Sequence, residues 1–289
     1  DREVKGPPAK VAFDADGEPT RAAQGFARSQ KVSVDDLTIQ EVDGGEYVVA
    51  RRVIEGNPTV DVLADLLPEW IATLTFPRSM RWNESAVSFS RPIRWLVALL
   101  DRYEVPFEYA GLESGRVTRG PRPDSSPEVA LSAAEDYEAT MGAYNIIVDP
   151  EARSAEILEQ AQTLAQEVDG HIPDDPALLE EVTHLVECPT ALLGSFEKRY
   201  LSLPQEVLIA VMKKHQRYFP VLNGRGRIMS YFVTVRNGGA KHLDKVRRGN
   251  EEVIRARYAD AEYFYNQDSR YPLEHYVDDL KKLTFQTDL

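Results

Sequence analysis

The chain has 289 residues, of which 43% are hydrophobic, so it can bury a substantial core, and its composition excludes an intrinsically disordered protein. Its formal net charge is −13, and its one cysteine, Cys188, excludes an internal disulfide. No apolar run reaches the ~18 to 20 residues of a membrane-spanning helix, so we expect a cytoplasmic globular protein. Because the chain starts without Met or a signal region and stops just after a helical pattern, we expect both ends to lie inside a longer polypeptide.

The first predicted elements are short and separated by turn residues. Lys10–Phe13 is predicted to be a strand, and residues 14–17 (DADG) a turn. A helix is expected to begin at Thr20. Glu46–Ile54 is rich in β-branched residues, which predicts a second strand.

A helix with apolar residues at helical spacing follows, capped by Thr59, and Pro68 is expected to kink or divide it. The string FSRPIRWLVALL predicts a buried strand over Val87–Leu100, with Val105–Tyr109 as its hairpin neighbour. Residues 120–127 (GPRPDSSP) hold three prolines and two serines, which is typical of a mobile loop or hinge.

The remaining sequence is predicted to be richer in helices. We expect helices near 128–141, 151–168 and 176–187, with a strand at 145–148 between the first two. Pro204 is placed to start a helix whose face holds Leu208, Val211, Met212 and His215. A hairpin is predicted from Tyr218–Leu222 and Ile228–Val235, joined by Asn-Gly-Arg-Gly, and then a long helix over 241–265. The fold class is therefore α+β: a mixed α/β domain at 1–120, then a helix-rich α+β domain at 121–289 that contains a β-hairpin.

Charge is distributed unevenly along the chain. Residues 205–257 hold twelve Lys or Arg and four acids, whereas residues 124–197 hold seventeen acids and one basic residue, Arg153. This separation suggests a surface that faces a polyanion, backed by a solvated acidic surface.

The basic stretch supplies the candidate binding residues, because Lys and Arg neutralise phosphates and Arg fits phosphate oxygens. A solvated charged face is the alternative. Aromatic residues lie among these cations and could stack on unpaired bases, although such residues more often belong to the core. The candidate nucleic-acid contacts are Lys213, Lys214, Arg217, Arg225, Arg227, Arg236, Arg247, Arg248, Arg255 and Arg257.

Other groups of residues give only weak indications of a metal-binding or catalytic site. Asp14 and Asp16 could hold magnesium, but a turn containing glycine explains them equally well. His184 and Cys188 are four residues apart on a predicted helix, which would suit metal ligation or nucleophilic catalysis, yet packing is the simpler interpretation. Glycine-rich phosphate loops and the GxSxG and HExxH motifs are absent. We therefore expect no catalytic residue and no metal site in this chain.

Six strings occur in one order: FPRSMRW (76–82), FSRPIRWLVALL (89–100), RVTRG (116–120), EEVTHLVECPTALLGSF (180–196), LPQEVLIAVMKKHQRYFPV (203–221) and GNEEVIRARYADAEYFYNQD (249–268). Together they resemble the β subunit of the bacterial heterotetrameric (α2β2) glycyl-tRNA synthetase, in its N-terminal and central part. The resemblance implies a tRNA-binding subunit, with the ATP-binding and Mg-binding active site on a separate α subunit. It implies that the α subunit and tRNA(Gly) are partners of this chain. It also implies that the chain is a fragment of the β subunit without the HD-type and anticodon-binding domains.

Two departures from the family pattern matter. The family usually reads TRGHRF where this chain has TRGPRP at 118–123, so a role tied to that His and Phe does not transfer. It usually has Trp where this chain has Cys188, which favours a space-filling residue. The leading hypothesis is a non-catalytic fragment that binds tRNA and supports ATP-dependent charging. The alternatives are a freestanding metal-dependent hydrolase or nucleotidyltransferase, and a purely scaffolding domain.

Overall fold

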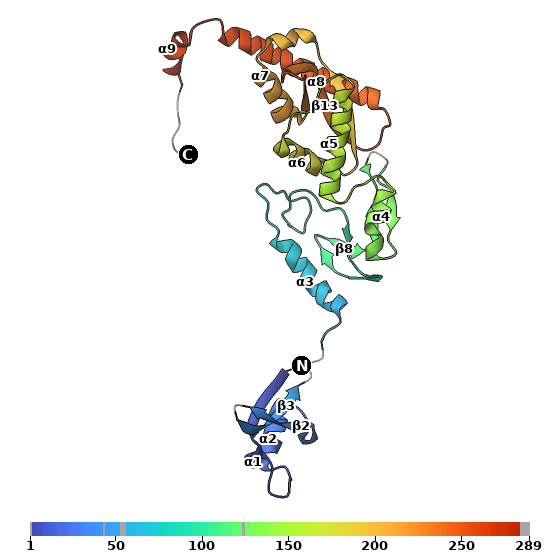
Figure 1. Cartoon of the computed structure of the whole chain (residues 1–289), viewed down its shortest axis with the longest axis vertical. Coiled ribbons are helices and arrows are strands. Elements are labelled where there is room, and N and C mark those ends of the chain that lie inside the picture. Colours follow the sequence, from blue (N-terminus) through green and yellow to red (C-terminus); the bar gives the residue numbers. More distant parts are fainter. Residues whose placement is uncertain (1, 43, 53–55, 123–124, 284–289) are drawn as a thin grey trace. The chain divides into compact units, whose positions relative to one another are not determined.

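The computed structural model describes residues 2–42, 44–52, 56–122 and 125–283. Helices and small sheets alternate along this part of the chain, which confirms the α+β class (Figure 1). The chain divides into two compact units, Asp1–Glu69 and Trp70–Leu289. The predicted division at 120/121 falls inside the second unit, and independent domains at 1–120 and 121–289 stay a prediction.

The first unit is a three-stranded antiparallel sheet covered by two helices. Its strands are β1 (Arg2–Pro8), β2 (Leu37–Val42) and β3 (Gly45–Arg52), in the order β1-β3-β2. The helical segments are α1 (Ala9–Ala12), α2 (Arg21–Gln30) and η1 (Val34–Asp36). Ala12, Ala23 and Val48 form the centre of its core, with Phe26 packed against them.

The strand predicted at Lys10–Phe13 is wrong, because these residues enter the short helix α1. Ala9 and Ala12 are both buried, and a spacing of three residues places them on one face of a helical turn. The predicted helix start is confirmed, since Thr20 caps α2 and its hydroxyl accepts a hydrogen bond from Ala22 N at 3.2 Å. The predicted strand at 46–54 is confirmed as β3 as far as residue 52, and residues 53–54 lie outside the described residues.

Helix α3 spans Thr59–Thr73, with Thr59 as its first residue. Pro68 lies within it, so the proline does not divide the helix. All described side chains of α3 are at least partly exposed, and Trp70 is 57% exposed.

The second unit opens with short strands: β4 (Leu96–Val97), β5 (Leu99–Leu100), β6 (Tyr103–Glu104), β7 (Glu108–Tyr109), β8 (Leu112–Gly115), β9 (Val117–Arg119) and β10 (Glu128–Ala130). The single strand predicted over 87–100 is wrong. Only its last residues form strands, and the chain changes partner at Ala98, since β4 pairs with β8 and β5 pairs with β6.

The helix predicted at 128–141 is also partly wrong. Residues 128–130 form strand β10, in which only the central Val129 is buried, and helical structure begins at η3 (Ala134–Asp136) and α4 (Tyr137–Gly142). The described residues of the predicted hinge segment, 120–122 and 125–127, lie between the paired strands β9 and β10, and residues 123–124 lie outside the described residues. Residues 145–148 form no strand; Ile147 N makes one backbone hydrogen bond, to Glu187 O at 2.9 Å.

The centre of the second unit is an antiparallel sheet with helices on both faces (Figure 1). Its strands are β11 (Pro189–Ser195), β12 (Phe219–Leu222) and β13 (Ile228–Asn237), in the order β11-β13-β12. Its helices are α5 (Pro150–Gln166), α6 (Pro176–Leu185), η4 (Lys198–Ser202), α7 (Gln205–Ala210) and α8 (Leu243–Asp268). Val233 packs against α5 and α6, whereas its neighbour Phe232 packs against α7 and α8, as strand alternation requires.

Gly194 has no side chain at the point where β11 passes Phe232. The two residues are cross-strand partners, and a Cβ on Gly194 would lie 2.3 Å from the Phe232 ring. The glycine therefore lets this buried ring lie flat against the neighbouring strand.

Most elements predicted after residue 150 are confirmed, namely α5, α6, α7, the β12–β13 hairpin and α8. A difference is the π-helical segment η5 (Val211–Gln216), which continues α7 and was not predicted. Leu208 and Met212 are fully buried, as expected, but His215 is exposed.

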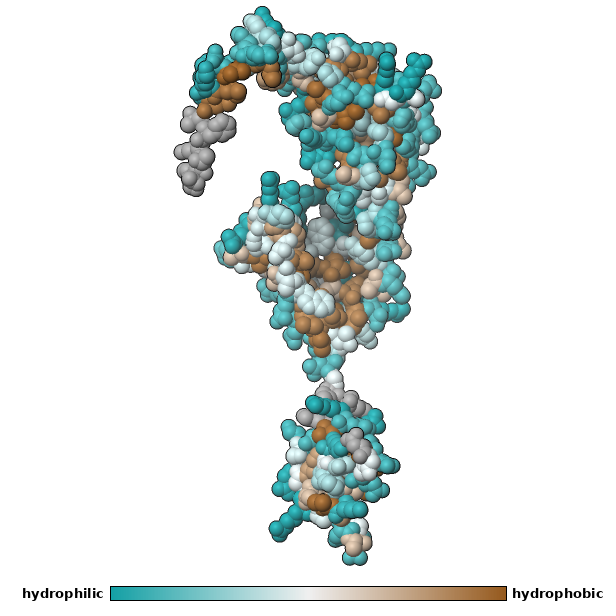
Figure 2. All heavy atoms as spheres, turned by 60° about the vertical axis from the view of Figure 1, so that its left-hand side comes forward, coloured by the Kyte–Doolittle hydropathy of each residue, from teal (hydrophilic) through white to brown (hydrophobic). Residues whose placement is uncertain are grey.

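The described chain ends with η6 (Leu273–Tyr276) and α9 (Val277–Leu280). Figure 2 shows hydrophobic side chains on the surface of this C-terminal arm, where Leu273 is 85% and Leu280 61% exposed. Among the described residues, none of the helices combines the length and hydrophobicity needed to cross a membrane.

Candidate nucleic-acid interface

The ten predicted contact residues lie on four neighbouring segments in sequence. Lys213, Lys214 and Arg217 lie on η5 and at its end; Arg225 and Arg227 lie on the hairpin turn; Arg236 lies near the end of β13; and Arg247, Arg248, Arg255 and Arg257 lie on α8.

Hydrogen bonds join these segments in the fold. Gln205, at the start of α7, accepts from Ile228 N at 2.9 Å and donates to Gly226 O at 3.3 Å, which fixes the hairpin turn. The Tyr218 hydroxyl donates to Asn250 Oδ1 at 2.5 Å, which joins the end of η5 to α8. Burial raises the pKa of Tyr218 to about 12, so this phenol stays a donor at neutral pH.

Acids from the acidic stretch reach into the basic one. Lys213 forms an ion pair with Asp175, and Arg217 Nε lies 2.7 Å from Glu181 Oε1, so both cations face acids on or next to α6. Glu197 is the third such acid, at 2.6 Å from Arg255 Nε. The two stretches are therefore not two separate surfaces, because the fold sets α6 beside η5.

Arg255 has a second carboxylate partner, since its Nη1 lies 2.5 Å from Glu252 Oε1. Hydrogen bonds and charge attraction from Glu252 and Glu197 raise the pKa of Arg255. The pKa of the Glu197 carboxyl is lowered: a backbone N–H has the largest effect, burial opposes it, and hydrogen bonding and charge attraction from Arg255 lower the pKa further.

Three further candidates are tied to groups nearby. Arg247 Nη2 lies 2.9 Å from Asp244 Oδ1. Arg236 donates to Lys241 O at 2.6 Å, and Arg248 donates to Asp244 O at 3.3 Å. Backbone carbonyls orient these last two guanidinium groups without neutralising them.

Four candidates are exposed and, in the part of the chain that the structure describes, have neither a carboxylate partner nor a side-chain hydrogen bond: Lys214, Arg225, Arg227 and Arg257. We call them the unpaired cations. The turn that carries two of them is well defined, because Asn223 Oδ1 accepts from Arg225 N at 2.9 Å and from Arg227 N at 3.1 Å. A phosphate can pair with these four without displacing an acid of the same chain.

Aromatic residues of the basic stretch mostly belong to the core. Tyr218 and Phe232 are buried and stack on each other with ring centroids 4.8 Å apart, and Phe219 is buried too. Tyr263 and Phe264, each 60% exposed, lie near the end of α8 instead. Tyr265, at the same end of the helix, is 40% exposed. Base stacking therefore stays a prediction for these exposed aromatic residues of α8.

Asp14 has a clear structural role. Its Oδ1 accepts hydrogen bonds from Asp16 N at 3.0 Å and Glu18 N at 2.9 Å, which closes the predicted turn. Across the described residues, three or more His, Cys, Asp or Glu side chains are nowhere grouped as metal ligands would be.

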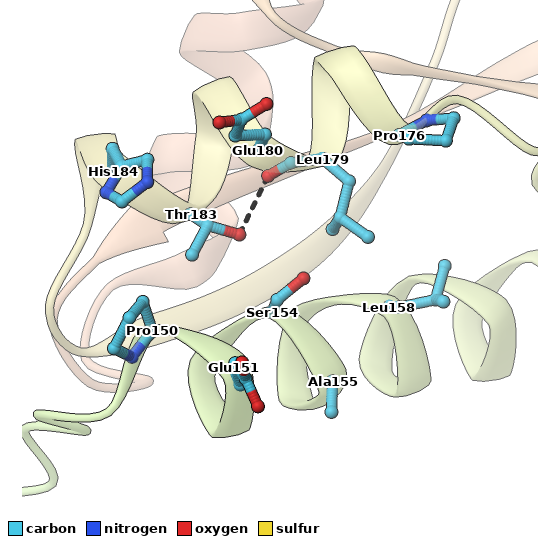
Figure 3. A pocket seen from close by; sticks show the side chains of 10 residues that line it. All are labelled: Pro150, Glu151, Ser154, Ala155, Leu158, Pro176, Leu179, Glu180, Thr183 and His184. Atoms are coloured by element: carbon cyan, nitrogen blue, oxygen red, sulfur yellow. Dashed lines mark hydrogen bonds between the residues drawn. The ribbon is translucent and has the colours of Figure 1, made fainter.

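His184 and Cys188 do not share a helix, because α6 ends at Leu185. Cys188 is buried, whereas Figure 3 shows His184 at the end of α6, above Pro150 at the start of α5. The groove between these helices has a volume of about 560 Å³ and is lined by apolar residues such as Leu158 and by Glu151 and Glu180. It contains no nucleophile and base within hydrogen-bonding distance of each other among its described lining residues.

A second group of cations was not selected from the sequence. Arg119, Arg122 and Arg153 line one pocket together with Trp95. Two features of the sequence could have drawn attention to these cations: Arg119 lies in the RVTRG string, and Arg153 is the one Arg or Lys in an acidic stretch. Neither signal reveals that these residues meet.

Comparison with known proteins identifies the family. The family model described as "Glycyl-tRNA synthetase beta subunit" matches residues 1–289. The glycine–tRNA ligase beta subunits of Desulfitobacterium hafniense (strain Y51), Moorella thermoacetica and Bacillus subtilis (strain 168) are 47%, 46% and 44% identical to this chain over 99%, 100% and 99% of its length. The chain spans 41%, 42% and 42% of those relatives, or about two fifths. The chain therefore belongs to the glycyl-tRNA synthetase beta subunit family.

Proposed function

We propose that this chain supports the ATP-dependent charging of tRNA(Gly) by binding tRNA and by assembling with a catalytic α subunit. The observation that carries the proposal is the family match over all 289 residues. The four unpaired cations support the tRNA-binding part, because they are exposed and lack carboxylate partners within the described chain.

The proposed contact is with the sugar-phosphate backbone. Lys214 extends from η5 and binds as a point charge, whereas Arg225 and Arg227 present forked donors on a turn fixed by Asn223. Each phosphate contact releases condensed counterions, so binding weakens as salt concentration rises. Phosphate contacts position the RNA and do not read its bases.

Adenylate chemistry is assigned to the partner. ATP and Mg are expected on the α subunit, and the proposed complex is an α2β2 tetramer in the cytoplasm. A purely scaffolding role predicts α binding without tRNA contact by these residues. A freestanding metal-dependent hydrolase is less well supported, because Asp14 Oδ1 is engaged by two backbone N–H groups.

The test replaces Lys214, Arg225 and Arg227 with Gln in the full-length β subunit, assembled with its α subunit. We expect the KM for tRNA in aminoacylation to rise about tenfold or more, while the KM values for glycine and ATP stay unchanged. Unchanged values for all three substrates, in an assembled complex, would reject this surface and favour the scaffolding role.

A further inference from the structure

A separate pocket of about 410 Å³ lies beside the β9–β10 hairpin, within the second unit. Its lining includes three guanidinium groups, those of Arg119, Arg122 and Arg153, and the imidazole of His184. Glu187 is the one carboxylate among its described lining residues. Glu128 lies 2.6 Å from Arg119 and neutralises it, so Arg122 and Arg153 supply the positive charge that favours an anionic ligand in this pocket.

Arg153 gives this pocket a fixed charge. It donates to Thr183 O at 2.9 Å, Ile147 O at 2.6 Å and Val148 O at 3.2 Å, and no carboxylate of the described chain pairs with it. The guanidinium is partly buried, so its field is less screened than that of a surface arginine. It is also the one basic residue between positions 124 and 197.

Trp95 adds a flat apolar surface to the same pocket. Its side chain is 40% exposed, and the Arg119 guanidinium lies 5.9 Å from its ring centroid. Arg119 is held in place by Glu128 at 2.6 Å and by Ser126 O at 3.4 Å. The ring and this guanidinium are therefore positioned before any ligand binds.

Arg122 completes the set. It is exposed, and within the described part of the chain its guanidinium has no carboxylate partner. All of its donors are therefore available to a phosphate. Arg153 uses Nε and Nη1 for its three carbonyl contacts, and its Nη2 donates to no group of the described chain, so that this nitrogen is available too.

We infer that this pocket binds one unpaired nucleotide of an RNA, with the base stacked on Trp95 and the phosphate held by Arg122 and Arg153. The volume lies in the range of about 300–1,000 Å³ that is typical of small-ligand sites, which is more than a single inorganic anion needs. Stacking on an aromatic ring is the common way to hold an unpaired base. The choice of RNA over a free nucleotide rests on the proposed function. The position of Trp95 beside three guanidinium groups is observed independently of that function.

The test uses the full-length β subunit and a short oligoribonucleotide that carries 4-thiouridine for photo-crosslinking, with AMP and inorganic phosphate as competitors. We expect a crosslink in the peptide that contains Trp95. W95L and R122Q should each lower the affinity for the oligoribonucleotide, measured by crosslinking yield, about tenfold. W95F should retain most of the affinity, because phenylalanine keeps a ring on which a base can stack.

Controls separate this site from the proposed surface. R102Q removes an exposed cation of the same unit and should change binding less than twofold. If phosphate competes as well as AMP and W95L binds normally, the pocket holds simple anions and the inference is overturned. It is also overturned if the crosslink maps elsewhere. Loss of tRNA binding in the Lys214, Arg225 and Arg227 variant, with the pocket crosslink intact, would support both proposals. Normal tRNA binding in that variant, with the crosslink intact, would reject the proposed surface alone.

Discussion

The salt dependence of tRNA binding should distinguish the unpaired cations from the paired ones. Each phosphate contact contributes about 0.7–0.9 to the slope of log affinity against log salt concentration. If Lys214, Arg225 and Arg227 each contact a phosphate, replacing all three with Gln lowers the slope by about 2–3. Between 50 and 200 mM salt the wild type should then lose about 16- to 64-fold more affinity than the variant. Filter-binding titrations of the full-length protein at four salt concentrations measure the two slopes.

A matched control removes the same number of charges from the paired set, by changing Lys213, Arg217 and Arg247 to Gln. These cations already face Asp175, Glu181 and Asp244, so a phosphate must compete with a carboxylate for each of them. We expect the slope to change by less than about 1. Equal changes of slope in the two variants would refute the reasoning, because binding would then follow net charge and not ion pairing.

Three further predictions concern stability and are measured by thermal unfolding. G194A should destabilise the protein by about 1–3 kcal/mol, because its Cβ would lie 2.3 Å from the buried Phe232 ring; a normal melting temperature would contradict this. Y258F should cost about 0.5–1.5 kcal/mol, because it removes a buried hydrogen bond from the Tyr258 hydroxyl to Leu208 O at 3.2 Å. The pKa of Glu197 is lowered from 4.5, so its ionised form stabilises the fold above pH 4.5, and this contribution disappears as the pH falls further. E197Q should therefore have a lower melting temperature than the wild type at pH 7, and the two melting temperatures should become equal in acid. An equal difference at both pH values would argue against that role.

Elements with strong local signals could be predicted from the sequence. The β12–β13 hairpin follows from Asn223 and Gly224 between alternating apolar residues, and its turn is closed by the Asn223 side chain. Helix α8 follows from the spacing of Ile254 and Tyr258, both fully buried. In each case the pattern and the packing depend on residues close together in the sequence.

Short strands and ion pairs could not be predicted in this way. Val129 is buried between two exposed neighbours, a strand pattern too short to outweigh a helical one. The π-helical geometry of η5 also leaves no signal in composition. The pairing of Arg217 with Glu181 joins residues 36 apart, and that of Arg255 with Glu197 joins residues 58 apart. Such pairs depend on how helices pack against the sheet, which local patterns do not determine.

The excess of +8 over residues 205–257 therefore overstates the positive charge that a ligand meets. Ion pairs with Asp175, Glu181 and Glu197 neutralise three of the candidate cations with acids from outside that stretch. Surface pairs of this kind contribute only about 0–1 kcal/mol to stability, so their main effect here is on which charges stay available. The same reasoning gives weight to Arg153: its neighbours in the sequence are acidic, but within the described chain its guanidinium donates to carbonyl oxygens and pairs with no carboxylate. For an RNA phosphate, the partner that a cation has in the fold matters more than the charge of its neighbours in the sequence.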